Sequence, residues 1–211
     1  SDRGYTGVLC AAGVNRVFVS LHAHTPALSD KITATPGSFE RTVSGIGNFI
    51  GTGTQTSVIF VMTSLNIGIL PEYLRFIAKE FGKIPVLLSM ASPYITPTLD
   101  NGVIPRYRDM EPVLKQAARI AAKKGIPLSA MEEQHRPPDC VLKDVRFLIR
   151  NLYVPLEKKY DATGFMKPDI CSGCASGSVC PGVKPFYARA HGISELAPVK
   201  DMVICAAKNS K

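Results

Sequence analysis

Residues Gln55–Met62 read QTSVIFVM, a nearly continuous apolar run that is typical of a β-strand buried on both faces of a sheet. Outward from this run, three further segments rich in branched or apolar residues favour strands: Val14–Leu21 (VNRVFVSL), Ile84–Ser89 and Ile126–Met131. Apolar residues at helical spacing predict helices over Gly7–Gly13, Ser38–Ile50, Pro71–Phe81 and Met110–Lys124. Strands that alternate with helices predict an α/β fold with parallel strands.

In such a sheet, ligands bind at the carboxyl ends of the strands. Those ends carry polar or turn-rich segments: Ser20–His24, Ser64–Asn66, Ser89–Pro93 and Glu132–Cys140. This placement predicts a site along one edge of the sheet. After residue 140 the alternation stops, and the pattern there favours only one short helix, over Phe186–His191.

Composition excludes several classes of protein. Of the 211 residues, 45% are hydrophobic and 20% charged, which excludes a wholly disordered chain. No apolar run approaches the roughly 18 residues that a membrane span needs, so no membrane partner is expected. The net charge of +8 comes from dispersed basic residues and Trp is absent, so nucleic-acid binding is not favoured. No export signal is visible, and we expect a cytoplasmic location.

The cysteines are the strongest chemical signal. Cys171, Cys174 and Cys180 fall within ten residues (CSGCASGSVC), where glycines and serines let the backbone wrap around a small object. Thiolates at this spacing bind a metal ion or a cluster readily, so the segment predicts a metal or iron–sulfur site. Structural zinc and disulfide bonds in a secreted protein are the open alternatives.

Several stretches resemble the radical S-adenosylmethionine (SAM) enzymes. VFVSLHAHTPALSDKITATPGSFERTVSGI (17–46) is similar to the family's fourth strand and the loop and helix after it. VIFVMTSLNIGILPEYLRFIAKEFG (58–82) resembles the fifth strand and its helix, and IPVLLSMASPY (84–94) the sixth. KPDICSGCASGSVCPGV (167–183), with Cys140 before it and Tyr187 and His191 after it, looks like the C-terminal part of members that carry an auxiliary iron–sulfur cluster.

The resemblance implies a fold and a division of the chain. The fold is an α/β, parallel-stranded partial (β/α) barrel fragment with a small Cys-rich C-terminal extension. Residues 1–135 would be the C-terminal half of the barrel, and residues 136–211 the auxiliary cluster-binding extension. In this alignment the strand at Ile126–Met131 is the link to the extension, and the N-terminal half of the barrel is expected to be missing.

The resemblance also implies an activity. Intact members use a SAM-bound cluster to generate a 5′-deoxyadenosyl radical, which abstracts hydrogen from a substrate. The Cys-x3-Cys-x2-Cys that holds that cluster is absent here, so we expect a fragment that is inactive alone. The alternative function is a non-catalytic iron–sulfur or zinc module that docks onto a separate N-terminal partner. The substrate is not identified by the sequence.

The resemblance further assigns individual residues. Cys140 would join Cys171, Cys174 and Cys180 as ligands of an auxiliary 4Fe-4S cluster, with Cys205 as a substitute for Cys140. Ser20 and Asn66 would contact SAM in the intact enzyme. For these two, the plainer interpretations are a strand-end hydroxyl bonded to backbone and a turn residue. His22 and His24 are expected to face solvent, and Cys10 to be a small buried residue on a helix.

Overall fold

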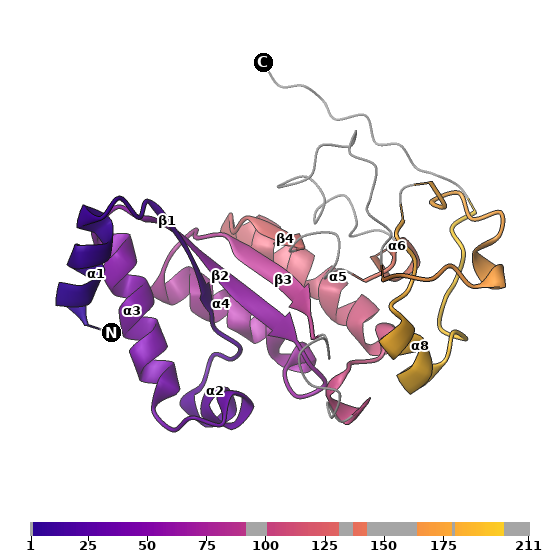
Figure 1. Ribbon diagram of the computed structural model, residues 1–211, viewed down its shortest axis with the longest axis horizontal. Coiled ribbons are helices and arrows are strands. Elements are labelled where there is room, and N and C mark those ends of the chain that lie inside the picture. Colours follow the sequence, from indigo (N-terminus) through magenta and orange to yellow (C-terminus); the bar gives the residue numbers. More distant parts are fainter. Residues whose placement is uncertain (1, 92–100, 131–136, 143–163, 179, 201–211) are drawn as a thin grey trace, which may run out of the picture.

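The computed structural model describes residues 2–91, 101–130, 137–142, 164–178 and 180–200. These residues form an α/β fold built on a parallel sheet of four strands in the order β1-β2-β3-β4 (Figure 1). The strands are β1 (Arg16–Ser20), β2 (Gln55–Met62), β3 (Val86–Met90) and β4 (Leu128–Ala130). The four strands expected from the apolar runs are therefore confirmed, and β4 pairs with β3 as a member of the sheet.

Seven α-helices accompany the sheet in the described part of the chain. They are α1 (Arg3–Ala11), α2 (Pro26–Thr33), α3 (Ser38–Gly51), α4 (Leu70–Glu80), α5 (Tyr107–Lys124), α6 (Asp139–Leu142) and α8 (Pro185–His191). Short 3-10 turns occur at η1 (Ile67–Ile69), η2 (Asn101–Val103) and η5 (Asp169–Cys171). None of the helices in the described ranges combines the length and the apolar character that a bilayer crossing requires.

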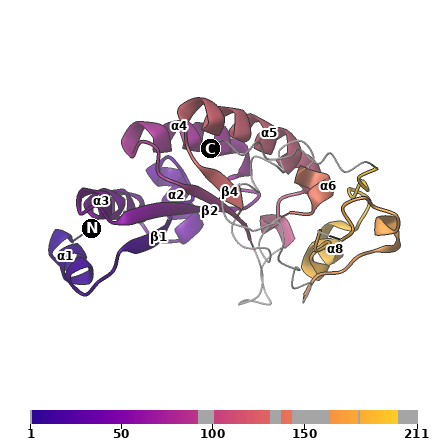
Figure 2. The ribbon, with the colours of Figure 1, turned by 90° about the horizontal axis from the view of Figure 1, so that it is seen from above.

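Alternation along the strands separates two faces of the sheet. Val58, Phe60 and Met62 of β2 point to one face, where they join a single apolar core with the buried sides of α4 and α5. Figure 2 shows α4 and α5 along one side of the strands. The opposite face is more polar, since Val61 is in register with the buried Ser89, and Leu87 with the buried Ser129.

Local chemistry explains three of the helix boundaries. Asp2 caps α1 by accepting hydrogen bonds from the backbone of Gly4 and Tyr5. The carboxylate of Asp30, on α2, caps the start of α3 by accepting hydrogen bonds from the backbone N–H groups of Gly37 and Phe39. At the other end of the layer, α5 stops at Gly125, whose φ of 69° is the left-handed conformation that favours glycine.

The C-terminal described segment lies at the end of the sheet toward which the strands point (Figure 1). Helix α6 packs against α5. Val183, Tyr187 and Leu196 belong to the same apolar core as the sheet and its helices. The predicted boundary between residues 135 and 136 falls outside the described residues, and the two-domain division stays a prediction.

Candidate metal centre

Four cysteines from distant parts of the chain surround one pocket. Cys140 comes from α6, Cys171 ends η5, and Cys174 and Cys180 follow in the next turns. The rest of the lining comes from Pro138, Asp139, Lys167, Gly177, Gly182, Val183, Leu196 and Pro198. Burial, together with the charges of Cys180, Cys171 and Cys174, raises the pKa of the Cys140 thiol to about 11. The four sulfur atoms therefore lie close enough to repel one another as thiolates.

The backbone around these cysteines is a series of tight turns. Pro168 precedes η5, and the amide of Cys174 donates to the carbonyl of Cys171 at 3.1 Å. Met166 and Val183 then form an antiparallel bridge that closes the segment. Gly182 has a φ of 103°, and a Cβ atom there would collide with the Met166 carbonyl, so only glycine fits this crossing.

Backbone N–H groups point at three of the four sulfur atoms. The amide of Asp139 donates to Cys180 Sγ at 3.4 Å, and the amide of Val199 donates to Cys174 Sγ at 3.3 Å. Ala197 supplies a backbone hydrogen bond to Cys140. Such donors stabilise negative charge on sulfur.

The fourth sulfur, that of Cys171, has a charged neighbour instead. Burial and the charges of Cys180 and Cys174 raise the pKa of its thiol, and the ammonium of Lys167 acts in the opposite direction. Lys167 also donates to the carbonyl of Gly177 across the turn. The pocket thus offers four sulfur donors together with groups that favour their ionised form.

A site for one metal ion needs its donor atoms close together. In the described ranges, no three Cys, His, Asp or Glu side chains approach closely enough to hold one metal ion. A tetrahedral zinc site with bonds of about 2.3 Å brings its sulfur atoms to roughly 3.8 Å from one another. No disulfide joins any of the five described cysteines, while Cys205 lies outside the described residues.

Cys10 lies far along the chain from this pocket. It is on α1, as expected, but it is half-buried rather than buried. Its sulfur contacts the hydroxyl groups of Thr52 at 3.5 Å and Thr54 at 3.3 Å. Those hydrogen bonds lower the pKa of the thiol.

The two residues expected to contact SAM have different surroundings. Ser20 ends β1 and is exposed, in register with Ile59 of β2. Asn66 is fully buried where the chain leaves β2. Both lie at the carboxyl edge of the sheet, as the sequence predicts, and their ligand contacts stay a prediction.

The amide of Asn66 is fully used inside the protein. Its Oδ1 accepts from the backbone N–H of Thr63 at 2.7 Å and from the Thr63 hydroxyl at 3.0 Å. Its Nδ2 donates to the carbonyls of His22 at 3.0 Å and Val61 at 2.9 Å. An asparagine side chain has two donors and one oxygen with two lone pairs, so these four bonds exhaust it. Asn66 therefore fastens the end of β1 to the end of β2.

The two histidines after β1 are partly enclosed, so the expectation that they face solvent is wrong. His22 accepts a long hydrogen bond of 3.4 Å from the amide of Val61, and burial lowers the pKa of its ring. The Nδ1 atom of His24 is buried and has no hydrogen-bond partner. The chain turns back toward β2 after Ser20, which carries both rings inward.

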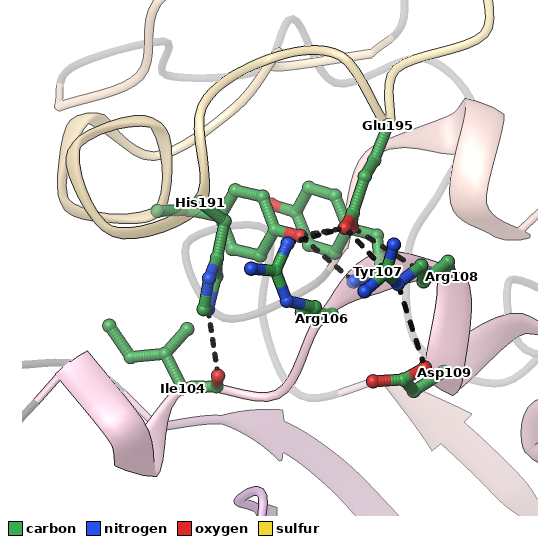
Figure 3. Close-up of polar contacts among 8 residues, drawn as sticks. Ile104, Arg106, Tyr107, Arg108, Asp109, His191 and Glu195 are labelled. Carbon is green, nitrogen blue, oxygen red and sulfur yellow. Dashed lines mark hydrogen bonds and ion pairs between the residues drawn. The ribbon is translucent and has the colours of Figure 1, made fainter.

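A polar cluster that the sequence did not predict joins the start of α5 to the segment after α8 (Figure 3). Glu195 accepts a 2.6 Å hydrogen bond from the Tyr187 hydroxyl and pairs with Arg106 at 3.0 Å. The amide of Tyr107 donates to the Tyr187 hydroxyl at 2.9 Å, and the two tyrosine rings stack 3.6 Å apart. His191 bonds the carbonyl of Ile104 at 2.9 Å.

This cluster adjoins the cysteine pocket. Burial raises the pKa of Tyr107, and the charges of Tyr187, Cys140, Cys180 and Glu195 add to the effect. Burial opposes the ionisation of Glu195, but hydrogen bonds from Tyr187 and Arg106 leave the pKa of its carboxyl below its ordinary value. Glu195 is therefore a carboxylate in the folded protein at neutral pH. No local pattern marks it, because its partners at 106 and 108 are almost 90 residues away in the sequence.

Comparison of the chain with protein-family models, with curated proteins and with solved structures finds no match.

Proposed function

We propose that the chain is the auxiliary-cluster part of a radical SAM enzyme, a partial (β/α) barrel with a Cys-rich C-terminal extension. Cys140, Cys171, Cys174 and Cys180 hold a 4Fe-4S cluster in this proposal. The carrying observation is that their side chains line one pocket although 30 residues lie between Cys140 and Cys171. Four thiolates are the usual ligand set for such a cluster.

The cluster is preferred to zinc because a zinc site would usually add a second closely spaced cysteine pair, whereas here Cys180 stands alone after Cys171 and Cys174, and Cys140 is remote in the sequence. Each sulfur on a four-iron cube binds a different iron atom, so the sulfurs stand farther apart than around one ion. No three such side chains form a single-ion site in the described ranges, and a cluster, whose sulfurs bind different iron atoms, does not require one. Backbone donors on Cys140, Cys174 and Cys180 are compatible with thiolates bound to either centre, because such bonds stabilise negative charge on sulfur.

The rest of the proposal concerns the edge of the sheet. When bound, the auxiliary cluster relays electrons or anchors the substrate. The pocket is linked to that edge through Tyr107 at the start of α5 and Tyr187 on α8. Ser20 remains the SAM contact in this proposal, because its side chain is exposed and can be reached by a ligand. Asn66 is left out of it, because a ligand could bind its amide only by breaking bonds inside the protein.

A second candidate is a non-catalytic module that docks onto a separate N-terminal partner. One edge of β1 has no partner strand in the sheet that the structure describes. Phe18 on this strand is 49% exposed, although it is a large apolar side chain. Unpaired strand edges pair readily with another chain. The described surface thus offers a place for further strands.

Two experiments test these proposals. The chain is reconstituted anaerobically with iron and sulfide, and the metal content of the wild type is compared with single Cys→Ser variants at positions 140, 171, 174 and 180, with Cys10→Ser as the matched control. The first four variants are expected to lose iron, and the control to keep it. Zinc in place of iron, or equal iron in all variants, would refute the cluster.

The second experiment measures 5′-deoxyadenosine formed from SAM and a reductant. The reconstituted chain alone is expected to form none, because it has no Cys-x3-Cys-x2-Cys. If the chain is part of a radical SAM enzyme, we expect 5′-deoxyadenosine to form once a polypeptide with that motif is added. If the chain is a non-catalytic docking module, we expect a stable complex with that polypeptide but no 5′-deoxyadenosine. Robust turnover by the chain alone contradicts both candidates.

A further inference from the structure

The segment that follows Glu195 forms one wall of the cysteine pocket. Leu196 and Pro198 line the pocket directly. Ala197, which lies between them, supplies a backbone hydrogen bond to Cys140. Val199, which follows Pro198, donates a hydrogen bond of 3.3 Å from its amide to Cys174 Sγ. Four consecutive residues thus provide two apolar wall groups and two donors to sulfur.

The far end of this segment is fixed to the pocket by a second bond. The carbonyl of Val199 accepts from the amide of Ala175 at 2.8 Å, while the Val199 amide serves Cys174. Val199 is therefore paired on both sides with the turn that holds Cys174. Its position determines how that N–H group points at the sulfur.

The near end is fixed by Glu195, whose side chain is only 9% exposed. The carboxylate is bound by Tyr187 at 2.6 Å and Arg106 at 3.0 Å, and both belong to elements packed in the core or at its edge. The amide of Leu196 also donates to the carbonyl of Ile193 at 3.0 Å, which closes the turn. Glu195 is consequently a charged anchor that ties residues 196–199 to the start of α5.

We infer that Glu195 is a positioning residue that tunes the auxiliary cluster through the amides of Ala197 and Val199. This inference rests on the proposed function. An N–H group directed at a ligand sulfur stabilises negative charge, and the reduced cluster carries one more negative charge than the oxidised cluster. Holding the segment in place therefore raises the reduction potential, and releasing it lowers the potential.

The test compares reduction potentials of the reconstituted full chain. Val199→Pro removes the N–H that serves Cys174, and Val199→Ala is its matched control because alanine keeps that N–H. Glu195→Gln weakens the anchor, and Glu72→Gln is its control because that residue forms an exposed pair with Arg75 on α4. The double variant of positions 195 and 199 tests whether both changes act by one route.

The expected result is a more negative potential for Val199→Pro and Glu195→Gln, with no shift in either control. Because the two changes share the Val199 amide, the double variant should shift the potential by less than the sum of the two single shifts. A potential that is unchanged or more positive in Glu195→Gln would overturn the inference, whatever the result for Val199→Pro. So would loss of iron from Glu195→Gln with its fold intact, because the residue is assigned to tuning and not to holding the cluster.

A second readout does not depend on the cluster. Hydrogen exchange of the peptide that spans residues 196–199 is measured in the metal-free chain, where Glu195→Gln should accelerate exchange and Glu72→Gln should not. Unchanged exchange contradicts the anchoring role. If the wild type takes up no cluster at all, the proposed function fails, while the exchange result still decides whether Glu195 holds this segment.

Discussion

The hydroxyl group of Tyr187 donates a 2.6 Å hydrogen bond to Oε2 of Glu195 and accepts one of 2.9 Å from the amide of Tyr107. One oxygen atom therefore joins α8, the segment after it and the first residue of α5. Because α5 begins where the chain returns from the carboxyl edge of the sheet, this oxygen also links that edge to the segment after Glu195, whose Leu196 and Pro198 line the cysteine pocket.

Tyr187→Phe should destabilise the fold while it keeps the stacked ring. The variant removes the acceptor of the buried Tyr107 amide and the donor to Glu195, and an unsatisfied buried group costs about 1–3 kcal/mol. Urea unfolding measures the loss. Tyr5→Phe is the control, because Tyr5 is 64% exposed and its change should leave the free energy of unfolding within about 0.5 kcal/mol. Equal stability of both variants would show that the hydroxyl is not a structural link.

Asn66→Ala and Ser20→Ala should differ sharply in stability. The first removes four internal hydrogen bonds at a fully buried position and leaves several backbone groups without partners, which should cost about 2 kcal/mol or more. The second changes an exposed strand end and should stay within about 0.5 kcal/mol. Thermal or urea unfolding compares the two. If Asn66→Ala were as stable as the wild type, the internal bonds of the Asn66 amide would not matter to the fold, and the amide would be available to a ligand.

Asp30 should make the fold sensitive to acid. Burial opposes its ionisation, but hydrogen bonds from the amides of Gly37 and Phe39 and from Ser38 bring the pKa of the folded protein below its ordinary value. A lowered pKa stabilises the fold above the unfolded value of about 3.9, and this contribution disappears as the pH falls through the folded value.

The measurement compares the wild type with Asp30→Asn at pH 7 and at about pH 3. The wild type should be the more stable of the two at pH 7, and the difference should shrink toward the lower pH. A difference that is the same at both values, or that grows in acid, would show that the carboxylate does not serve the start of α3.

Gly182→Ala should empty the cysteine pocket. The added Cβ would collide with the Met166 carbonyl, and a φ of 103° is strained for any L-residue, so the Met166–Val183 bridge beside Cys180 has to open. Iron content after reconstitution should fall well below the wild-type level. Gly51→Ala is the control, since a Cβ there meets nothing within 4 Å. Full iron content in Gly182→Ala would mean that the bridge does not shape the pocket.

The sequence predicted the sheet and most of its helices, because those elements follow from local patterns. QTSVIFVM gave the bounds of β2 without error, and helical spacing placed α3 and α4 to within a residue or two. Helix α5 begins at Tyr107, three residues before the predicted start, and Arg106 occupies the N-cap position in place of Asp109. The stack of Tyr107 on Tyr187, 80 residues away, accounts for the difference, and no local pattern shows it.

The candidate site divides in the same way. Cys171, Cys174 and Cys180 are neighbours in the sequence, so their spacing was enough to suggest a shared centre. Cys140 was assigned only through the family resemblance, yet it lines the same pocket. Glu195 was missed, since a lone carboxylate in a loop gives no signal until Arg106 and Tyr187 are placed beside it. Helix α2 was missed as well, although Pro26 at its start is a common opening residue.

The most direct measurement is a crystal structure of the anaerobically reconstituted chain, with anomalous diffraction recorded at the iron edge. The account predicts one compact iron peak bonded to the sulfur atoms of Cys140, Cys171, Cys174 and Cys180, with the amide of Val199 still on Cys174. A peak at the zinc edge alone, or an iron site that leaves Cys140 unbonded, would contradict it.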